Sequence, residues 1–215
     1  MRAWARVALL GALLAGVAPP RAARAQVPPA GAPGAESLQL PTFTAVSSCA
    51  PFTVLVAPSP AGGGGANTSS VLFEAEPEVS PAVALQVADG VLYISPRADF
   101  ASAAPIKLTA RVPAAALTAV AARGGGTVAV ASGFDVPALA LSATGTSRIA
   151  ARGVTAASLE VTAEGTSSVF VSGRLGSARV EQEGTSKVAL DGAQGPVSGS
   201  LEGISKLFVN PADGG

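Results

Sequence analysis

One short turn recurs four times in the second half of the chain. It reads Gly-Thr-Ser, with Ile in place of Thr in the last copy, and the copies begin at Gly145, Gly165, Gly184 and Gly203. Each copy precedes one polar and one aliphatic residue. Gly125-Gly126-Thr127 with Gly133 forms a degenerate earlier copy, which makes five tandem units. A nearly constant period of this length is typical of repeat architectures, in which each unit is one supersecondary element.

Units of about 20 residues, with short alternating strands and glycines at the corners, predict coils of a β-solenoid. A single coil buries too few side chains to offset the entropy of ordering its backbone, so the coils must stabilise one another. Equivalent positions would stack at the ~4.8 Å spacing of neighbouring strands. Two such columns are Leu141, Val161, Val180 and Gly199, and Ile149, Val169, Val188 and Leu207. The predicted fold is therefore an all-β, single-stranded parallel β-solenoid (β-helix).

Alternating β-formers upstream of the repeat predict strands over 52–56, 83–87, 91–94 and 106–112. Asp89-Gly90 predicts a hairpin turn, because glycine adopts positive φ without steric cost. The Ala-rich segment 113–122 has helical propensity, but helices of this length are marginal without packing.

The N-terminus has the features of a secretory signal peptide. Arg2 and Arg6 precede an apolar run from Val7 to Ala18, and Ala23-Arg24-Ala25 matches a cleavage site. An uncleaved membrane anchor is the disfavoured alternative, because this run is shorter than the ~20 apolar residues that spanning needs. We expect a secreted protein, extracellular or periplasmic, without a membrane span after cleavage.

The remaining chain divides by composition. We predict a signal peptide over 1–25, a Pro/Ala/Gly-rich linker over 26–48, the β-solenoid domain over 49–209 and a tail over 210–215. Asn67, in a Gly-rich loop, heads the N-glycosylation pattern Asn67-Thr68-Ser69, which would be used only in a suitable eukaryotic pathway.

Composition excludes the commonest catalytic and metal sites. The chain has no histidine and one cysteine, so it can form neither a Ser-His-Asp triad nor a Cys/His zinc site. We predict no catalytic residues, metal site or cofactor. Cleavage at residue 25 would remove four arginines, leaving 14 − 4 = 10 basic against 14 acidic residues. A net charge of −4 argues against nucleic acid as a partner. Cys49 is interpreted as a small buried apolar side chain, with an intermolecular disulfide as the alternative.

Stacking the units also aligns polar residues. Ser147, Ser167, Ser186 and Ser205 form a column that suits hydrogen bonding at the coil corners better than nucleophilic catalysis. We name two further columns for their charge. The acidic row is Glu164, Glu183 and Glu202, and the basic row is Arg148, Lys187 and Lys206, interrupted by Ser168.

The structural interpretation of both rows is a solvated face with ion pairs across the turn. The functional interpretation is a binding surface, on which the carboxylates hold Ca²⁺ or contact sugar hydroxyls. The expected carboxylate spacing is also near that of retaining glycosidases, but a flat ladder offers no pocket for catalysis.

Three features together resemble a known family. They are the strand-turn-strand Val87–Ile94, the strand Ile106–Val112 running into Pro113 and Leu117, and the repeated Gly-x-Ser turn. From about Phe52 to Val209 the chain resembles the head GIN domain of putative auto-transporter adhesins, a family of exported β-solenoid domains. The family has no catalytic residues to carry over.

These observations lead to one functional expectation with two alternatives. We expect a secreted, non-enzymatic, adhesin-like binding module for surface or matrix polysaccharide or protein. The first alternative is a structural protein that self-associates through the open edge of its last coil. The second is a carbohydrate-active enzyme that uses the acidic row.

Overall fold

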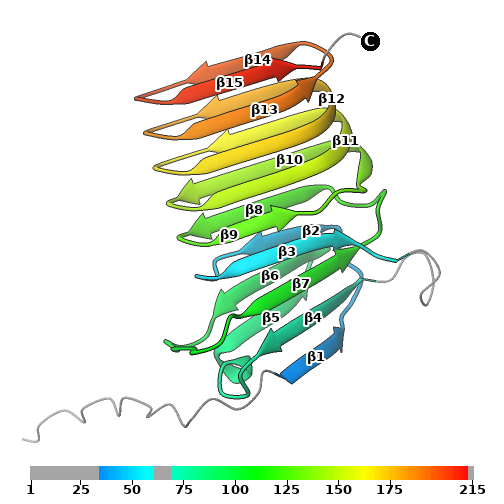
Figure 1. Ribbon diagram of the computed structural model, residues 1–215, viewed down its shortest axis with the longest axis vertical. Helices are drawn as coiled ribbons and strands as arrows, with labels where there is room; N and C mark the ends of the chain where they lie inside the picture. The colour runs from blue at the N-terminus through cyan, green and yellow to red at the C-terminus, as the bar shows by residue number, and fades with distance from the viewer. Residues whose placement is uncertain (1–33, 61–68, 213–215) are drawn as a thin grey trace, which may run out of the picture.

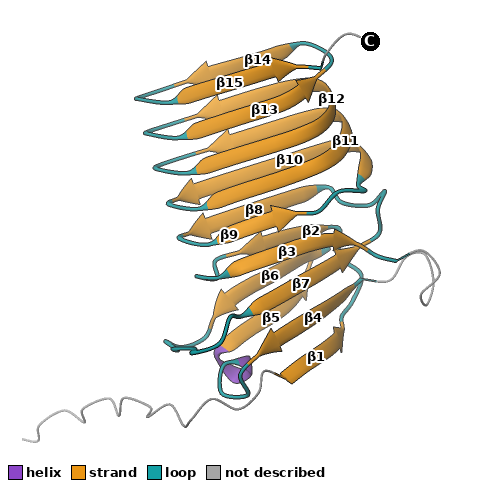
Figure 2. Ribbon diagram, in the orientation of Figure 1, coloured by secondary structure: helices purple, strands orange, loops and turns teal. Residues whose placement is uncertain are grey.

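The computed structural model describes residues 34–60 and 69–212 and shows a parallel β-solenoid (Figure 1). Apart from one 3-10 turn, η1 (Ser80–Ala82), its regular structure is strand throughout (Figure 2). The predicted fold class is confirmed. The signal peptide and Asn67 lie outside the described residues. Within those residues, no helix has the length and apolar character that crossing a membrane requires.

The repeat forms the C-terminal part of the stack. Each coil runs along the sheet at the back of Figure 1, turns, and returns along the sheet at the front; we call these the rear sheet and the front sheet. The strands are β8 (Ala119–Gly124), β9 (Thr127–Val130), β10 (Asp135–Gly145), β11 (Arg148–Ala163), β12 (Ser168–Gln182), β13 (Lys187–Ala193), β14 (Val197–Leu201) and β15 (Lys206–Pro211).

The two long strands contribute to both sheets. The first halves of β11 and β12 lie in the front sheet with β9, β13 and β15, and their second halves lie in the rear sheet with β8, β10 and β14. Alternate side chains point inward, and most of the aliphatic ones there are buried. Both predicted columns are confirmed: Leu141 pairs through Val161 and Val180 to Gly199, and Ile149 through Val169 and Val188 to Leu207.

The earliest repeat copy begins one residue before its predicted position. Gly124 pairs with Gly145, and Thr127 pairs with Arg148. The corner is therefore Gly124-Gly125-Gly126. Because its glycines are consecutive, the sequence alone did not distinguish the two registers.

A further rung precedes the repeat. β2 (Ala45–Ser48) pairs with β8 and β6 (Val91–Pro96), and β3 (Thr53–Pro58) pairs with β9 and β7 (Lys107–Val112), all in parallel. The chain thus forms this rung first. It then forms β6 and β7 on one side of the rung and β8 and β9 on the other side. Segment 113–122, which has helical propensity, instead forms a turn followed by most of β8.

Antiparallel strands close the N-terminal end. β5 (Val83–Ala88) pairs with β6, β4 (Ser70–Ala75) pairs with β7, and β1 (Gly34–Gln39) pairs with β4. Asp89 and Gly90 both have positive φ, +50° and +72°, as a tight two-residue hairpin turn requires. The predicted hairpin is confirmed.

The strand bounds revise three sequence-based expectations. β1 and β2 lie within 26–48, so this range is not a linker throughout, and β15 extends to Pro211 inside the predicted tail. The burial predicted for Cys49 is wrong: the thiol is free and exposed, because the residue begins the turn after β2 rather than occupying an inward strand position.

Candidate functional site

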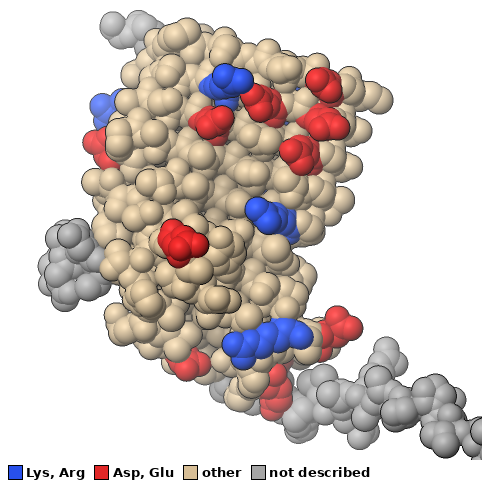
Figure 3. Space-filling model, turned by 180° about the vertical axis from the view of Figure 1, so that it is seen from behind, with Lys and Arg blue, Asp and Glu red and all other residues tan. Residues whose placement is uncertain are grey.

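The acidic row lies where the rear-sheet strands end and the turns begin. The backbone N–H groups of Glu164, Glu183 and Glu202 donate to carbonyl oxygens of the preceding coil at 2.9, 2.9 and 2.8 Å. These bonds hold the three residues in register, one per coil, and all three are exposed. Figure 3 shows acidic side chains gathered on the rear face over the C-terminal coils.

A shallow hollow of about 350 Å³ joins this row to its neighbours on the rear sheet. Arg179 and Glu181 form an ion pair there, with Nη2 and Oε1 2.8 Å apart. The hydrogen bond from Arg179 to Glu181, followed by the charge of that carboxylate, raises the pKa of Arg179 above its ordinary value. The lining residues are Thr162, Glu164, Arg179, Glu181, Gln182, Glu183, Ser200 and Glu202.

The spacing of the carboxylates limits what they can hold. Among residues 34–60 and 69–212, no three acidic or sulfur ligands converge in a way that could hold a metal ion. With one glutamate per coil at ~4.8 Å intervals, the row resembles a ladder rather than a cage. Its geometry suits successive contacts along an extended ligand better than Ca²⁺ chelation.

The basic row lies on the opposite sheet. Arg148, Lys187 and Lys206 are the first residues of front-sheet strands, and all are exposed. The predicted ion pairs across the turn are wrong: the described residues contain only the pairs Lys107–Glu74 and Arg179–Glu181. The turn separates the rows because its serine points inward, leaving acidic and basic side chains directed outward from different faces.

The serine column points into the coil. Ser147 Oγ donates to Ala122 O at 2.8 Å, Ser186 Oγ accepts from Gln182 Nε2 at 3.1 Å, and Ser205 Oγ donates to Glu202 O at 2.7 Å. The corner hydrogen-bonding role is confirmed at these positions. Ser167 Oγ is also buried, with no hydrogen-bond partner among the described residues.

Two further outward columns lie beside these rows and were not predicted from the sequence. On the rear sheet, Thr162, Glu181 and Ser200 stand in register beside the acidic row. On the front sheet, Phe170, Ala189 and Phe208 stand beside the basic row. Both columns could have been predicted with the same coil-to-coil spacing. One column lies two residues before the acidic row, and the other lies two residues after the basic row.

The comparisons with known proteins agree with this architecture. The family model described as "Putative auto-transporter adhesin, head GIN domain" matches residues 43–195, from before β2 to beyond β13. A putative adhesin from Bacteroides fragilis is 12% identical, with a TM-score of 0.51 and coverage of 82% of this chain and 96% of that chain. A putative adhesin from Parabacteroides distasonis is 14% identical, with a TM-score of 0.58 and coverage of 83% and 77%. At these identities the likeness to the two structures is one of fold. No curated protein matches the chain.

Proposed function

Because the chain belongs to the head GIN domain family of putative auto-transporter adhesins, we propose that it is a non-enzymatic binding module that attaches to surface or matrix polysaccharide. The observation that carries this proposal is the display of the two charged rows on open sheet faces: the acidic row has one glutamate per coil, and the basic row is interrupted only at Ser168. A polymer of repeating units can contact several coils at once. Individually weak contacts then add up to useful avidity.

The same geometry disfavours catalysis. In a catalytic site of the usual kind, a few polar groups converge in a concave, largely apolar pocket. The acidic row instead borders a shallow polar hollow, and the serine hydroxyls at 147, 167 and 186 are buried inside the coils. These features support a binding role over a carbohydrate-active enzyme.

We also propose that the module is exported and acts outside the cell or in a periplasm. The signal-like segment 1–25 and the adhesin family both support this location. Mass spectrometry of the protein recovered from its expressing cells should find a mature chain that begins at Gln26. A chain retaining residues 1–25 would contradict cleavage.

Binding to a glycan and cell-wall array tests the main proposal. Labelled residues 26–215 should bind at micromolar concentration, with and without calcium. In one variant Gln replaces the three residues of the acidic row, and in a second variant Gln replaces the three residues of the basic row. The variant that lacks the contacting row should bind at least tenfold more weakly. Glu78→Gln/Asp89→Asn removes two exposed charges outside the repeat and serves as the control. The proposal fails if the unmodified chain binds nothing.

A structural, self-assembling role is the second candidate, and the end of the solenoid favours it. In the described part of the chain, β14 pairs only with β12 and β15 only with β13, so both have a free edge. Ile204 is 75% exposed at this end, and Val209 is 42% exposed. Light scattering across a concentration series should then show dimers that Ile204→Lys disrupts. A monomer at every concentration would eliminate this role.

A further inference from the structure

Three neighbouring strands of the front sheet form a patch that includes two members of the basic row, Lys187 and Lys206. Successive outward positions on a strand are two residues apart, and the pairing of β12 with β13 and of β13 with β15 aligns them. We call these nine residues the front patch. They are Ser168, Phe170 and Ser172 on β12, Lys187, Ala189 and Asp191 on β13, and Lys206, Phe208 and Asn210 on β15.

The centre of the front patch is hollow. Phe170 and Phe208 lie two strands apart, roughly 9.6 Å at ~4.8 Å per strand, and only the methyl group of Ala189 lies between them. All three line a hollow of about 580 Å³, and Phe208 is 57% exposed. Two aromatic side chains with a small residue between them leave room for a ring-shaped ligand.

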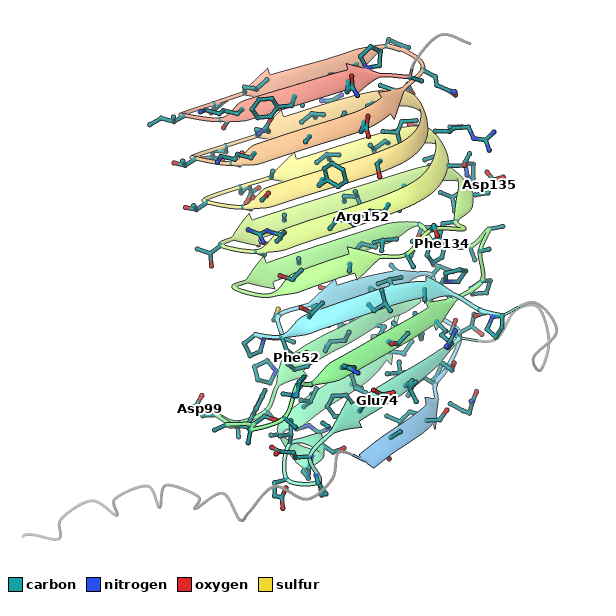
Figure 4. The ribbon with its side chains drawn as sticks, viewed as in Figure 1. Phe52, Glu74, Asp99, Phe134, Asp135 and Arg152 are labelled. Carbon is teal, nitrogen blue, oxygen red and sulfur yellow. The ribbon has the colours of Figure 1, made fainter. Side chains whose placement is uncertain are left out.

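Neighbouring side chains hold this arrangement in place. The guanidinium carbon of Arg152 lies 6.0 Å from the centroid of the Phe170 ring. Arg152, labelled in Figure 4, belongs to β11. Because β11 borders β12 on the side opposite β13, Arg152 supports Phe170 from the side away from the hollow. Asn210 Nδ2 donates to Asp191 Oδ1 at 2.8 Å, which fixes a carboxylate and a carboxamide at one margin of the hollow.

Beyond the opposite end of the hollow, whose lining does not include them, two lysines make the front patch positively charged. Lys187 and Lys206 precede Ala189 and Phe208 by two residues, and neither forms an ion pair with a described residue. Lys187 and Asp191 are four residues apart on one strand, roughly 13 Å at ~3.3 Å per residue. A ligand between them would meet two ammonium groups on one side and hydrogen-bonding oxygens on the other.

We propose that the front patch binds a pyranose ring that carries a carboxylate, a uronic acid unit of an acidic polysaccharide. This inference rests on the proposed polysaccharide-binding function and names the sugar and its site. The C–H faces of the ring pack against Phe170 and Phe208, which buries apolar surface on both sides. Its hydroxyls hydrogen-bond to Asp191 and Asn210, and its carboxylate accepts charge-assisted hydrogen bonds from Lys187 and Lys206.

NMR titration of residues 26–215 with methyl glucuronide tests the site directly. Shift changes should concentrate at Phe170, Ala189 and Phe208, and methyl glucoside should produce them only at several-fold higher concentration. Phe208→Ala should weaken binding of the glucuronide at least fivefold. Leu55→Ala is the matched control, because Leu55 is 37% exposed in the same outward column but lies three strands from Phe170.

The outcomes separate this inference from the broader function. No shifts at the front patch with methyl glucuronide, or equal shifts with both sugars, overturn the inference. Array binding to polygalacturonate that survives Phe208→Ala and Lys187→Gln/Lys206→Gln also overturns it and leaves the adhesin proposal standing. Front-patch shifts without binding to any polymer uphold the site and refute the adhesin proposal.

Discussion

Gly184 occupies a corner of the solenoid where a side chain has no room. Its φ is +82°, and a Cβ built on it would lie 2.7 Å from the carbonyl oxygen of Gly165 in the preceding coil. That is well inside the 3.4 Å at which ordinary van der Waals contact begins. The Gly165 carbonyl cannot easily retreat, because it accepts a 2.7 Å hydrogen bond from the N–H of Thr185.

Gly184→Ala should therefore destabilise the solenoid by two additive effects. The left-handed backbone costs a non-glycine residue about 1–2 kcal/mol. Forcing a methyl group into closely packed atoms typically costs a further ~1–3 kcal/mol. The expected loss in free energy of unfolding is about 2–5 kcal/mol.

Gly125→Ala is the matched control at the equivalent turn of an earlier coil. Gly125 has no positive φ, and its added Cβ would meet only Thr146 Oγ1 at 3.5 Å. The substitution should leave stability unchanged or raise it by about 0.4–1 kcal/mol, because it restricts the unfolded chain.

Urea unfolding followed by far-ultraviolet circular dichroism measures both variants. With an m-value of about 2 kcal/mol/M, Gly184→Ala should lower the midpoint by roughly 1–2.5 M relative to the unmodified chain. A Gly184→Ala midpoint within about 0.3 M of that of Gly125→Ala would refute the steric reasoning.

Two further predictions concern residues outside the repeat. The Glu76 side chain is 2% exposed, and its Oε2 accepts from Ser102 Oγ at 3.0 Å and Ala103 N at 3.1 Å. Glu76→Ala should lower stability by about 1–3 kcal/mol and speed proteolysis of the 97–106 loop, because it leaves Ala103 N–H without an acceptor, whereas Ser102 Oγ retains its 2.6 Å bond to Ala104 O. Glu76→Gln, which keeps an acceptor oxygen, should cost less, and equal losses in the two variants would contradict this role. Cys49 is exposed, so a maleimide should label it in the folded protein nearly as fast as in urea, whereas protection in the fold would show that the thiol is covered.

Within the repeat, the sequence sufficed to predict the fold and the members of each row. Each coil pairs with the next at a nearly constant separation along the chain, and a shared glycine turn sets the register. The inward column Ile149, Val169, Val188 and Leu207 therefore follows from counting alone, as do the acidic and basic rows. Because neighbouring strands have the same spacing in every sheet, the position of a residue within its repeat unit gives its position in the column.

The strands of the N-terminal end have no repeat of constant spacing from which their pairing could be counted. Thr44 and Thr118 hydrogen-bond although they lie 74 residues apart, and no motif common to their segments marks the pairing. The β2–β3 rung consequently escaped prediction as a coil, and the exposure of Cys49 in its turn was missed with it.

The sequence by itself determined that this chain stacks coils of nearly equal length and which residues share a column. Only the tertiary structure decided which way each column faces. Spacing places Glu183 and Lys187 on either side of one turn, but the inward serine between them directs the two side chains out of opposite sheets. The hollow between Phe170 and Phe208 depends in the same way on three strands lying side by side, which no single stretch of sequence specifies.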